Sequence, residues 1–154
     1  MKKAAIIFLG GALLLSAAAW PYYHSQQIYQ ALHNNPSITL LDTPKTLVDD
    51  FKLLDHKNQI FTTGSFKSKW NVVFFGYTHC PDVCPYTLVV LNQVAGKIKD
   101  PDAFRFIFVS VDPERDTPKI LSSFITFYNS DFIGVSGEES QIYAFTQQVN
   151  IKYE

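Results

Sequence analysis

Apolar and polar positions along residues 46–154 fall into blocks that predict strands followed by helices. Residues 72–75 form a short β-rich apolar run that ends at Gly76, which is typical of a strand buried on both faces. The segment after it carries apolar residues at steps of three and four, which predicts a helix. We predict strands at residues 70–78, 104–112 and 132–136, and helices at 85–98, 117–129 and 138–149. This alternation predicts an α/β domain with a parallel sheet and helices on its faces.

A small hairpin is predicted ahead of this alternation. Residues 51–54 and 59–61 have the pattern of two short strands, and the turn between them falls at residues 55–58. Residues 46–154 are enough for one modest core and not for two. The formal net charge of −1 argues against a nucleic-acid partner, because binding to phosphates requires a basic surface.

The N-terminus carries an uncharged apolar run at residues 4–20, behind two lysines. A helix over this run is about 25 Å long, just short of a hydrocarbon core, and the aromatic residues after it extend it to the interface. We therefore predict a single transmembrane anchor over residues 1–23, with the domain on the extracytoplasmic side. A cleaved signal peptide ending near Ala17-Ala18-Ala19 is the alternative. The run lacks the Arg-rich pattern of a mitochondrial transit peptide, which favours a bacterial inner membrane and a periplasmic domain.

The next segment, residues 24–45, is polar and contains two prolines, and we interpret it as a tether to the domain at residues 46–154. At the other end, the strand and helix pattern stops near residue 149. Right-handed crossovers place the later strands on one side of strand 70–78, and no remaining segment covers its other edge. We therefore expect the C-terminal strands and the last helix of the fold to be missing from this chain.

The only two cysteines, Cys80 and Cys84, lie between strand 70–78 and the helix after it. We predict an irregular turn after Pro81 and a helix that begins at Pro85, because proline at the first helical position costs no backbone hydrogen bond. Cys84 would then be the N-cap, where the helix dipole favours a thiolate, although Asp82 opposes this through like charge.

Two thiolates at this spacing are soft donors that select Cu(I) over hard cations. The same pair could instead work as a redox pair and close into a disulfide. A purely structural disulfide, or two inert buried thiols, is the alternative that carries no function. We favour a functional pair, because a staple around three intervening residues gains little stability.

Several polar residues near the cysteines are weaker candidates. We expect His79 to be a partly exposed turn residue that tunes the neighbouring thiol, and His56 to be a solvated residue of the hairpin turn. Asp82 either faces a partner or makes a local turn hydrogen bond. Residues 112–116 are expected to form a turn with their charges on the surface near the cysteines. We interpret one aromatic cluster as core packing and not as a cofactor site: Phe124, Phe127, Tyr128 and Phe132.

Two motifs resemble the signatures of the Sco/SenC family. Residues 76–85, GYTHCPDVCP, look like its first motif, and residues 109–118, VSVDPERDTP, match its second. The resemblance extends over about residues 47–150. It implies a thioredoxin-like fold with an N-terminal β-hairpin, carried on a single membrane anchor. It also implies copper binding through Cys80, Cys84 and a distant histidine, and a role in assembling the binuclear copper centre of cytochrome c oxidase.

The sequence departs from this family pattern in its metal ligands. The family's histidine follows a later strand, beyond the last residue of this chain. By resemblance, only Cys80 and Cys84 carry over as ligands. We therefore expect this chain to retain Cu(I) and to hold Cu(II) poorly, whereas the complete protein would hold both. None of the histidines present takes the missing position: His24, His33, His56 and His79.

The leading hypothesis is a membrane-anchored copper chaperone that transfers a metal and is not a turnover enzyme. Its expected partners are the copper-bearing subunit of cytochrome c oxidase and other copper chaperones or thiol reductants. The alternative is an extracytoplasmic thiol–disulfide reductase that acts on the cysteines of that copper centre. A peroxide-reducing enzyme is a weaker alternative, because a peroxidatic thiol needs a cationic neighbour and Asp82 is acidic.

Overall fold

The computed structural model of the chain describes residues 51–153, together with residues 47 and 48 and the isolated positions 19, 23, 26, 27, 30 and 34. The chain divides into two units, Met1–Lys45 and Thr46–Glu154. Within the described residues, no helix is both long enough and apolar enough to cross a membrane. The anchor predicted over residues 1–23 lies almost entirely outside them.

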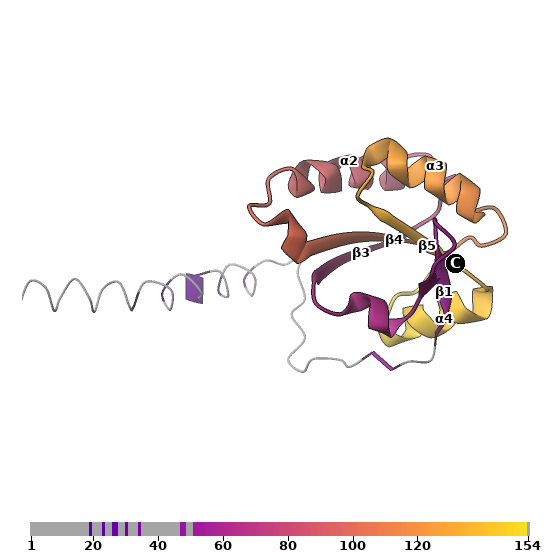
Figure 1. Cartoon of the computed structure of the whole chain (residues 1–154), viewed down its shortest axis with the longest axis horizontal. Helices are drawn as coiled ribbons and strands as arrows, with labels where there is room; N and C mark the ends of the chain where they lie inside the picture. Colours follow the sequence, from indigo (N-terminus) through magenta and orange to yellow (C-terminus); the bar gives the residue numbers. More distant parts are fainter. Residues whose placement is uncertain are drawn as a thin grey trace, which may run out of the picture. The chain divides into compact units, whose positions relative to one another are not determined.

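A sheet of five described strands forms the centre of the second unit (Figure 1). Its strand order is β2-β1-β5-β4-β3. The last three strands along the chain run parallel, while β1 pairs antiparallel with both β2 and β5. The strands span Leu53–Asp55 (β1), Ile60–Phe61 (β2), Trp70–Gly76 (β3), Phe104–Ser110 (β4) and Ile133–Ser136 (β5). The predicted hairpin and parallel sheet are therefore confirmed.

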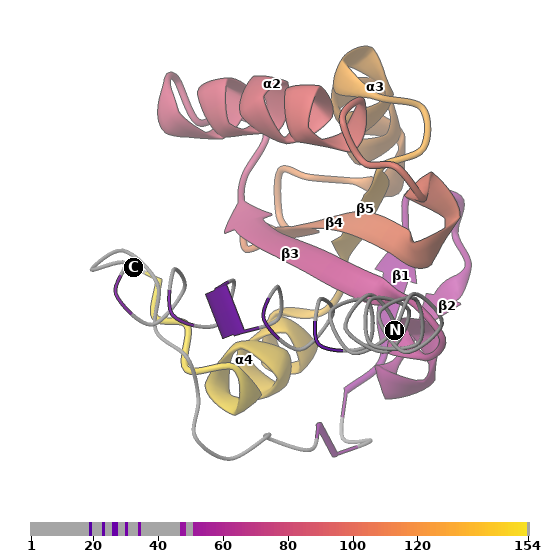
Figure 2. The ribbon, with the colours of Figure 1, turned by 90° about the vertical axis from the view of Figure 1, so that its left-hand side faces the viewer.

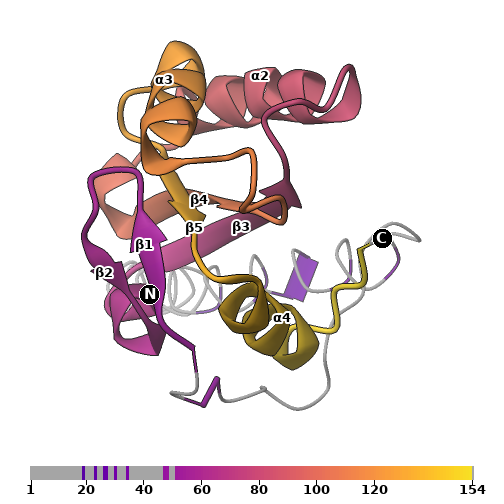
Figure 3. The ribbon, with the colours of Figure 1, turned by 90° about the vertical axis from the view of Figure 1, so that its right-hand side faces the viewer.

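Helices cover both faces of this sheet. The α-helices span Val83–Ala95 (α2), Pro118–Tyr128 (α3) and Glu139–Gln148 (α4), and two 3₁₀ helices span Thr63–Phe66 (η1) and Pro101–Ala103 (η2). Helices α2 and α3 lie on one face, and α4 lies on the other (Figures 2 and 3). Helix α3 begins as predicted, with the Thr117 side chain accepting a hydrogen bond from the amide of Ile120.

The strand β4 separates two hydrophobic clusters, one under each layer of helices. Phe106 and Phe108 belong to the cluster that contains residues of α2 and α3. Ile107 and Val109 belong to the cluster that contains residues of α4 and of the hairpin. Because successive side chains of a strand point to opposite faces, both sets are buried, and this explains why the strand is apolar at consecutive positions.

Strand β3 is an edge strand in the part of the chain that the structure describes. It pairs along its whole length with β4, from Trp70 opposite Phe104 to Gly76 opposite Ser110, and with no other described strand. The prediction that the later strands lie on one side of β3 is thus confirmed. Among the described strands, none pairs with the other edge of β3.

Two side chains lie where the sequence did not predict them. Phe127, assigned to the core, is 83% exposed on the outer side of α3, whereas Phe132 is buried and Phe124 and Tyr128 pack against the core. His56, predicted to be solvated, is 6% exposed. Its amide donates to the carbonyl of Gly134 (2.7 Å), and its Nδ1 accepts from the amide of Gly134 (3.1 Å). His56 follows Asp55, the last residue of β1, and its imidazole takes the place of a backbone carbonyl in the pairing with β5.

Candidate functional site

The two cysteines lie at the carboxyl end of β3, where the chain turns into α2. The helix begins at Val83, with Asp82 as its N-cap and Cys84 as its second residue. The prediction that Pro85 begins the helix and that Cys84 is its N-cap is therefore wrong. Pro85 is the third helical residue, and its missing amide is one of those that have no helical partner at a helix start. The helix can thus begin earlier than the proline suggested.

Gly76 is the last residue of β3, and it allows Cys84 to pack against the strand. A Cβ at position 76 would lie 2.8 Å from Sγ of Cys84 and 3.0 Å from a ring carbon of Phe108. The distance to the thiol is shorter than a Cβ tolerates, and the distance to the ring is tight, so a residue larger than glycine would displace the thiol. The Cys84 side chain is consequently buried, at 5% exposure, between the strand and the helix.

The two sulfurs are free thiols that interact directly. The backbone amide of Cys84 donates a hydrogen bond to Sγ of Cys80, at 3.4 Å. Hydrogen bonding by the Cys84 side chain, followed by that of the backbone at Cys84 and Asp82, lowers the pKa of Cys80. Burial, followed by the hydrogen bond to Cys80, raises the pKa of Cys84 to about 11. The predicted preference for a Cys84 thiolate is therefore wrong, and the more accessible Cys80 carries the thiolate character.

A buried carboxylate, Asp116, connects the cysteine loop to the loop after β4. It is 1% exposed, and it accepts hydrogen bonds from the amide of Thr78 (2.9 Å), the hydroxyl of Thr78 (2.5 Å) and the hydroxyl of Ser110 (2.5 Å). Because Thr78 lies two residues before Cys80, these bonds fix the start of the cysteine loop. The prediction that the charges of residues 112–116 lie on the surface is wrong for Asp116.

The importance of Asp116 was missed, although the sequence carried a signal for it. Ser110 ends one strand and Thr78 follows the neighbouring parallel strand, so that their carboxyl ends meet at the same edge of the sheet. An acid shortly after Ser110 is then well placed to accept from both hydroxyls. The rest of the segment fits the prediction better, since Arg115 is exposed and forms an ion pair with Asp112 that raises the pKa of Arg115.

His79 is exposed, as predicted, but it does not complete a metal site. Its Nδ1 lies 3.0 Å from the hydroxyl of Thr78 and 3.7 Å from a carboxylate oxygen of Asp116. Within the described part of the chain, no three side chains of the histidine, cysteine, aspartate and glutamate types are grouped to hold a metal ion. The exposed Asp82 makes no side-chain capping bond to α2.

The arrangement supports two kinds of chemistry. Two thiols in contact, one accessible and one buried, form a soft donor pair that suits Cu(I). The same asymmetry suits thiol–disulfide exchange, in which the outer thiolate attacks and the inner thiol follows. The structure thus defines a mixed α/β domain with a thiol pair at the carboxyl end of a parallel strand.

Comparison with known proteins places this domain in a family. The model of the SCO1/SenC family matches residues 41–154, and the chain belongs to this family. It is similar to the copper-bound structure of ScoI from Bradyrhizobium japonicum, with a TM-score of 0.65 and 35% identity over 70% of each chain. The apo Sco1 structure from Thermus thermophilus matches with a TM-score of 0.67 and 35% identity, over 75% of this chain and 67% of that one. The fold is accordingly the thioredoxin-like fold of these Sco structures.

Curated sequences give the same result. The mitochondrial SCO2 homolog of Mus musculus is 35% identical over 107 residues, which cover 68% of this chain and 42% of that protein. The SCO2-like protein of Rickettsia felis is 32% identical over 105 residues, or 68% of this chain and 51% of that protein. The chain thus spans about half the length of the curated relatives that it matches.

Proposed function

We propose that this chain binds copper through Cys80 and Cys84 and assists assembly of the binuclear copper centre of cytochrome c oxidase. The observation that carries the proposal is the placement of both free thiols at the carboxyl end of β3, where the amide of Cys84 donates a hydrogen bond to Sγ of Cys80. Related Sco proteins with copper bound share the fold, at 35% and 31% identity. The donor set fits Cu(I), because two thiolates are soft ligands and the inner thiol is protected from solvent.

Cys80, Cys84 and Gly76 have different roles in binding the ion. Cys80 enters as the accessible thiolate, and Cys84 gives up its proton when the metal binds, since thiolates and not thiols are the metal ligands. Gly76 leaves the space in which the Cys84 sulfur packs. Among residues 51–153, no third histidine, cysteine, aspartate or glutamate is grouped with the two thiols. We expect a pair of thiolates to retain Cu(I) and to hold Cu(II) poorly.

Competition with a Cu(I) chelator tests the proposal. The full chain should take Cu(I) from the chelator in a 1:1 ratio, and the double variant Cys80→Ser with Cys84→Ser should bind at least about a hundredfold more weakly. His79→Ala, at an exposed position next to Cys80, is the matched control and should retain the affinity of the unchanged chain. Equal affinity of the unchanged chain and the double serine variant would refute copper binding at this pair.

A second candidate function, reduction of disulfides in a partner, is favoured by the unequal pKa values of the two thiols. The Cys80 thiolate would attack the partner's disulfide, form a mixed disulfide and release one partner thiolate. Cys84 would then lose its proton and attack the Cys80 sulfur, which releases the second partner thiolate and leaves a Cys80–Cys84 disulfide. A mixed disulfide that accumulates in Cys84→Ser and not in Cys80→Ser supports this function. Trapping in neither variant counts against it.

The location of the domain is part of the proposal. We propose that residues 1–23 anchor the chain in a bacterial inner membrane and that the domain lies on the periplasmic side, where a thiol pair can meet oxidase subunits during assembly. The apolar run at residues 4–20 and the two lysines ahead of it support this. A membrane-impermeant maleimide should label Cys80 in intact spheroplasts. Labelling only after the membrane is broken would place the domain on the other side.

A further inference from the structure

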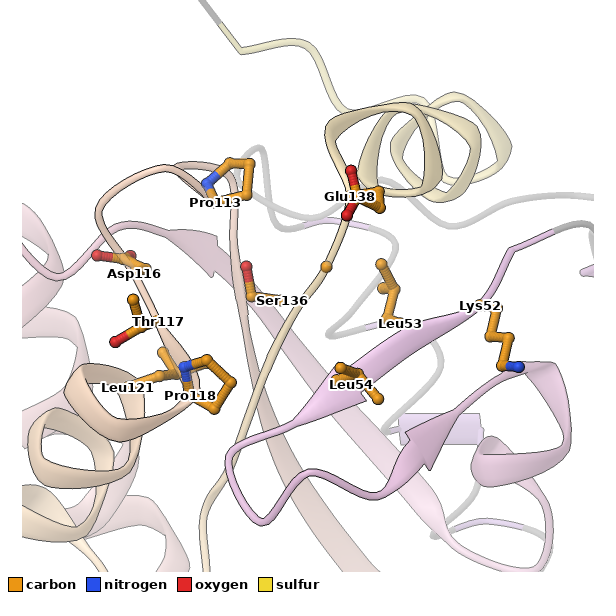
Figure 4. Close-up of a pocket in the computed structure, with 11 residues that line it drawn as sticks. Lys52, Leu53, Leu54, Pro113, Asp116, Thr117, Pro118, Leu121, Ser136 and Glu138 are labelled. Carbon is orange, nitrogen blue, oxygen red and sulfur yellow. The ribbon is translucent and has the colours of Figure 1, made fainter.

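A second hollow lies at the same end of the sheet as the cysteines, and the copper chemistry does not use it. It is a cleft of about 420 Å³ between the loop after β4 and the hairpin strand β1 (Figure 4). Its walls come entirely from residues 52–138, on the β5 side of the sheet and not at the open edge of β3. The lining residues are Lys52, Leu53, Leu54, Pro113, Asp116, Thr117, Pro118, Leu121, Ser136, Gly137 and Glu138.

The position of the cleft is one at which α/β sheets form binding sites. Strand β4 leads into α3 on one face of the sheet, while its parallel neighbour β5 leads into α4 on the opposite face (Figure 3). The two connections therefore diverge at the carboxyl ends of adjacent strands and leave a crevice between them. Such a crevice at a switch in strand connection is where ligands of open α/β sheets bind.

The polar groups of the cleft define what it can receive. Five of its lining side chains are apolar, and of these Leu54 is exposed whereas Leu53 and Leu121 are buried beneath the surface of the cleft. Ser136 is 7% exposed, and its hydroxyl has no hydrogen-bond partner among the described residues. Glu138 stands at the rim, whereas the ammonium of Lys52 points away from the other lining side chains (Figure 4). The cleft thus suits an apolar group that carries a hydrogen-bond donor, and it does not suit an anion.

The cleft is also connected to the cysteine loop. Asp116 lines the cleft, and its carboxylate accepts hydrogen bonds from both the amide and the hydroxyl of Thr78, two residues before Cys80. The loop of residues 112–118, which carries Asp116, also supplies Asp112 and Arg115 to the hollow that Cys84 lines. A protein that brings its own cysteines to Cys80 would therefore meet the loop that the two hollows share. Tyrosine and tryptophan combine a flat apolar body with a donor, and they are enriched among side chains that anchor protein interfaces.

We propose that this cleft receives a tyrosine or tryptophan side chain of the protein that presents its cysteines to Cys80. The choice of occupant rests on the proposed function, because a partner that docks at the thiol pair supplies the side chain. The ability of the cleft to accept a donor-bearing aromatic ring rests on the cleft alone. The two statements can be tested separately.

Methyl NMR tests the cleft without using the thiols. The full chain, labelled at leucine methyl groups and held in lipid nanodiscs, is titrated with N-acetyltryptophanamide and, as a control, N-acetylglycinamide. A ring bound in the cleft should shift the methyl resonances of Leu54 and Leu121 upfield and saturably. The replacement Leu54→Trp fills the cleft and should weaken binding at least about tenfold, while Val94→Trp, at an exposed position of α2 that does not line the cleft, should not. Absence of these shifts, or shifts that persist in Leu54→Trp, would overturn the proposal.

Thiol exchange tests the occupant. Peptides carry one cysteine as a mixed disulfide with 5-thio-2-nitrobenzoate, and a tryptophan or an alanine at successive positions along the chain. Attack by the Cys80 thiolate joins the peptide to Cys80 and releases the coloured nitrobenzoate thiolate. For one spacing, tryptophan should accelerate release about tenfold over alanine, and Leu54→Trp should remove the gain. Ring-current shifts without any such gain would overturn the assignment to a thiol-presenting partner. Failure of the copper competition with these gains intact would refute copper binding and leave the docking cleft standing.

Discussion

The loops after β3 and β4 lie at the carboxyl ends of neighbouring strands, yet the first exposes its ionisable side chain and the second buries it. The loop after β3 leaves Cys80 partly exposed. The loop after β4 buries the carboxylate of Asp116 and gives it three hydrogen bonds, two of them from Thr78. The start of the loop that carries Cys80 is therefore held by a buried acid from another strand connection. The stability of the first loop depends on the second.

Removal of the buried acid should have the largest effect on this pair of loops. In Asp116→Ala, the amide and hydroxyl of Thr78 and the hydroxyl of Ser110 lose their acceptor in a buried setting. We expect the free energy of unfolding to fall by about 3 kcal/mol, measured by urea denaturation of the full chain. The variant Asp112→Ala is the matched control on the same loop. Its ion pair with the exposed Arg115 contributes little to stability, so its unfolding free energy should change much less. Equal losses in both variants would contradict the role given to Asp116.

Replacement of Gly76 should disturb the inner thiol directly. The added Cβ of Gly76→Ala meets Sγ of Cys84 and the ring of Phe108, and we expect a loss of about 2 kcal/mol in unfolding free energy, together with weaker Cu(I) binding. The matched control is Gly96→Ala at the end of α2, where the nearest atom would lie 3.7 Å away. A Gly76→Ala variant as stable as Gly96→Ala would show that the packing of Cys84 is not tight.

The pH dependence of alkylation should separate the two thiols. Because hydrogen bonds lower the pKa of Cys80, its reaction with iodoacetamide should reach half of its maximal rate below the pH that is usual for a free cysteine. Burial raises the pKa of Cys84 to about 11, so Cys84 should stay protonated and react slowly until strongly alkaline pH. Peptide mapping by mass spectrometry at each pH gives the two rates. Faster modification of Cys84 would reverse the roles proposed here.

The smallest effect is expected on the helix that follows the second loop. Phe127 is exposed on α3, and Phe127→Ser should change the unfolding free energy by no more than about 0.5 kcal/mol. Phe124 lies three residues earlier and packs against Phe108 and Tyr128, so Phe124→Ser should cost about 2 kcal/mol. Thermal or urea unfolding of the two variants side by side checks the contrast. A costly Phe127→Ser would indicate that this ring is covered by another surface.

The strands and the position of the thiol pair were predictable because they follow from local pattern. The apolar run of β4 predicted a strand buried on both faces, and Phe106 and Ile107 indeed enter opposite clusters. The depth of single polar residues was not predictable in this way. His56 lies in a turn, yet it is buried because its ring replaces a strand carbonyl opposite Gly134. Asp116 is buried because two strands far apart in sequence bring hydroxyls to it.

The roles of the two cysteines show the same limit. Sequence spacing correctly placed Cys80 between a strand and a helix, but not Cys84, because the predicted helix start at Pro85 was two residues late. That difference moves Cys84 from the cap into the helix, where it packs against the end of β3. Burial then outweighs the helix dipole and raises the pKa of Cys84 instead of lowering it. Local rules for helix starts contain no information on that burial.

The central claim is that both sulfurs bind Cu(I) as thiolates, and the pH dependence of Cu(I) affinity tests it most directly. Metal binding must displace the proton of Cys84 at neutral pH and, in part, that of Cys80. The apparent affinity, measured against a chelator of known pH dependence, should therefore rise by at least about tenfold for each unit of pH between 6 and 8. In Cys84→Ser, the affinity should be lower and its rise with pH shallower. An affinity that does not change with pH, or that is the same in Cys84→Ser, would contradict the account.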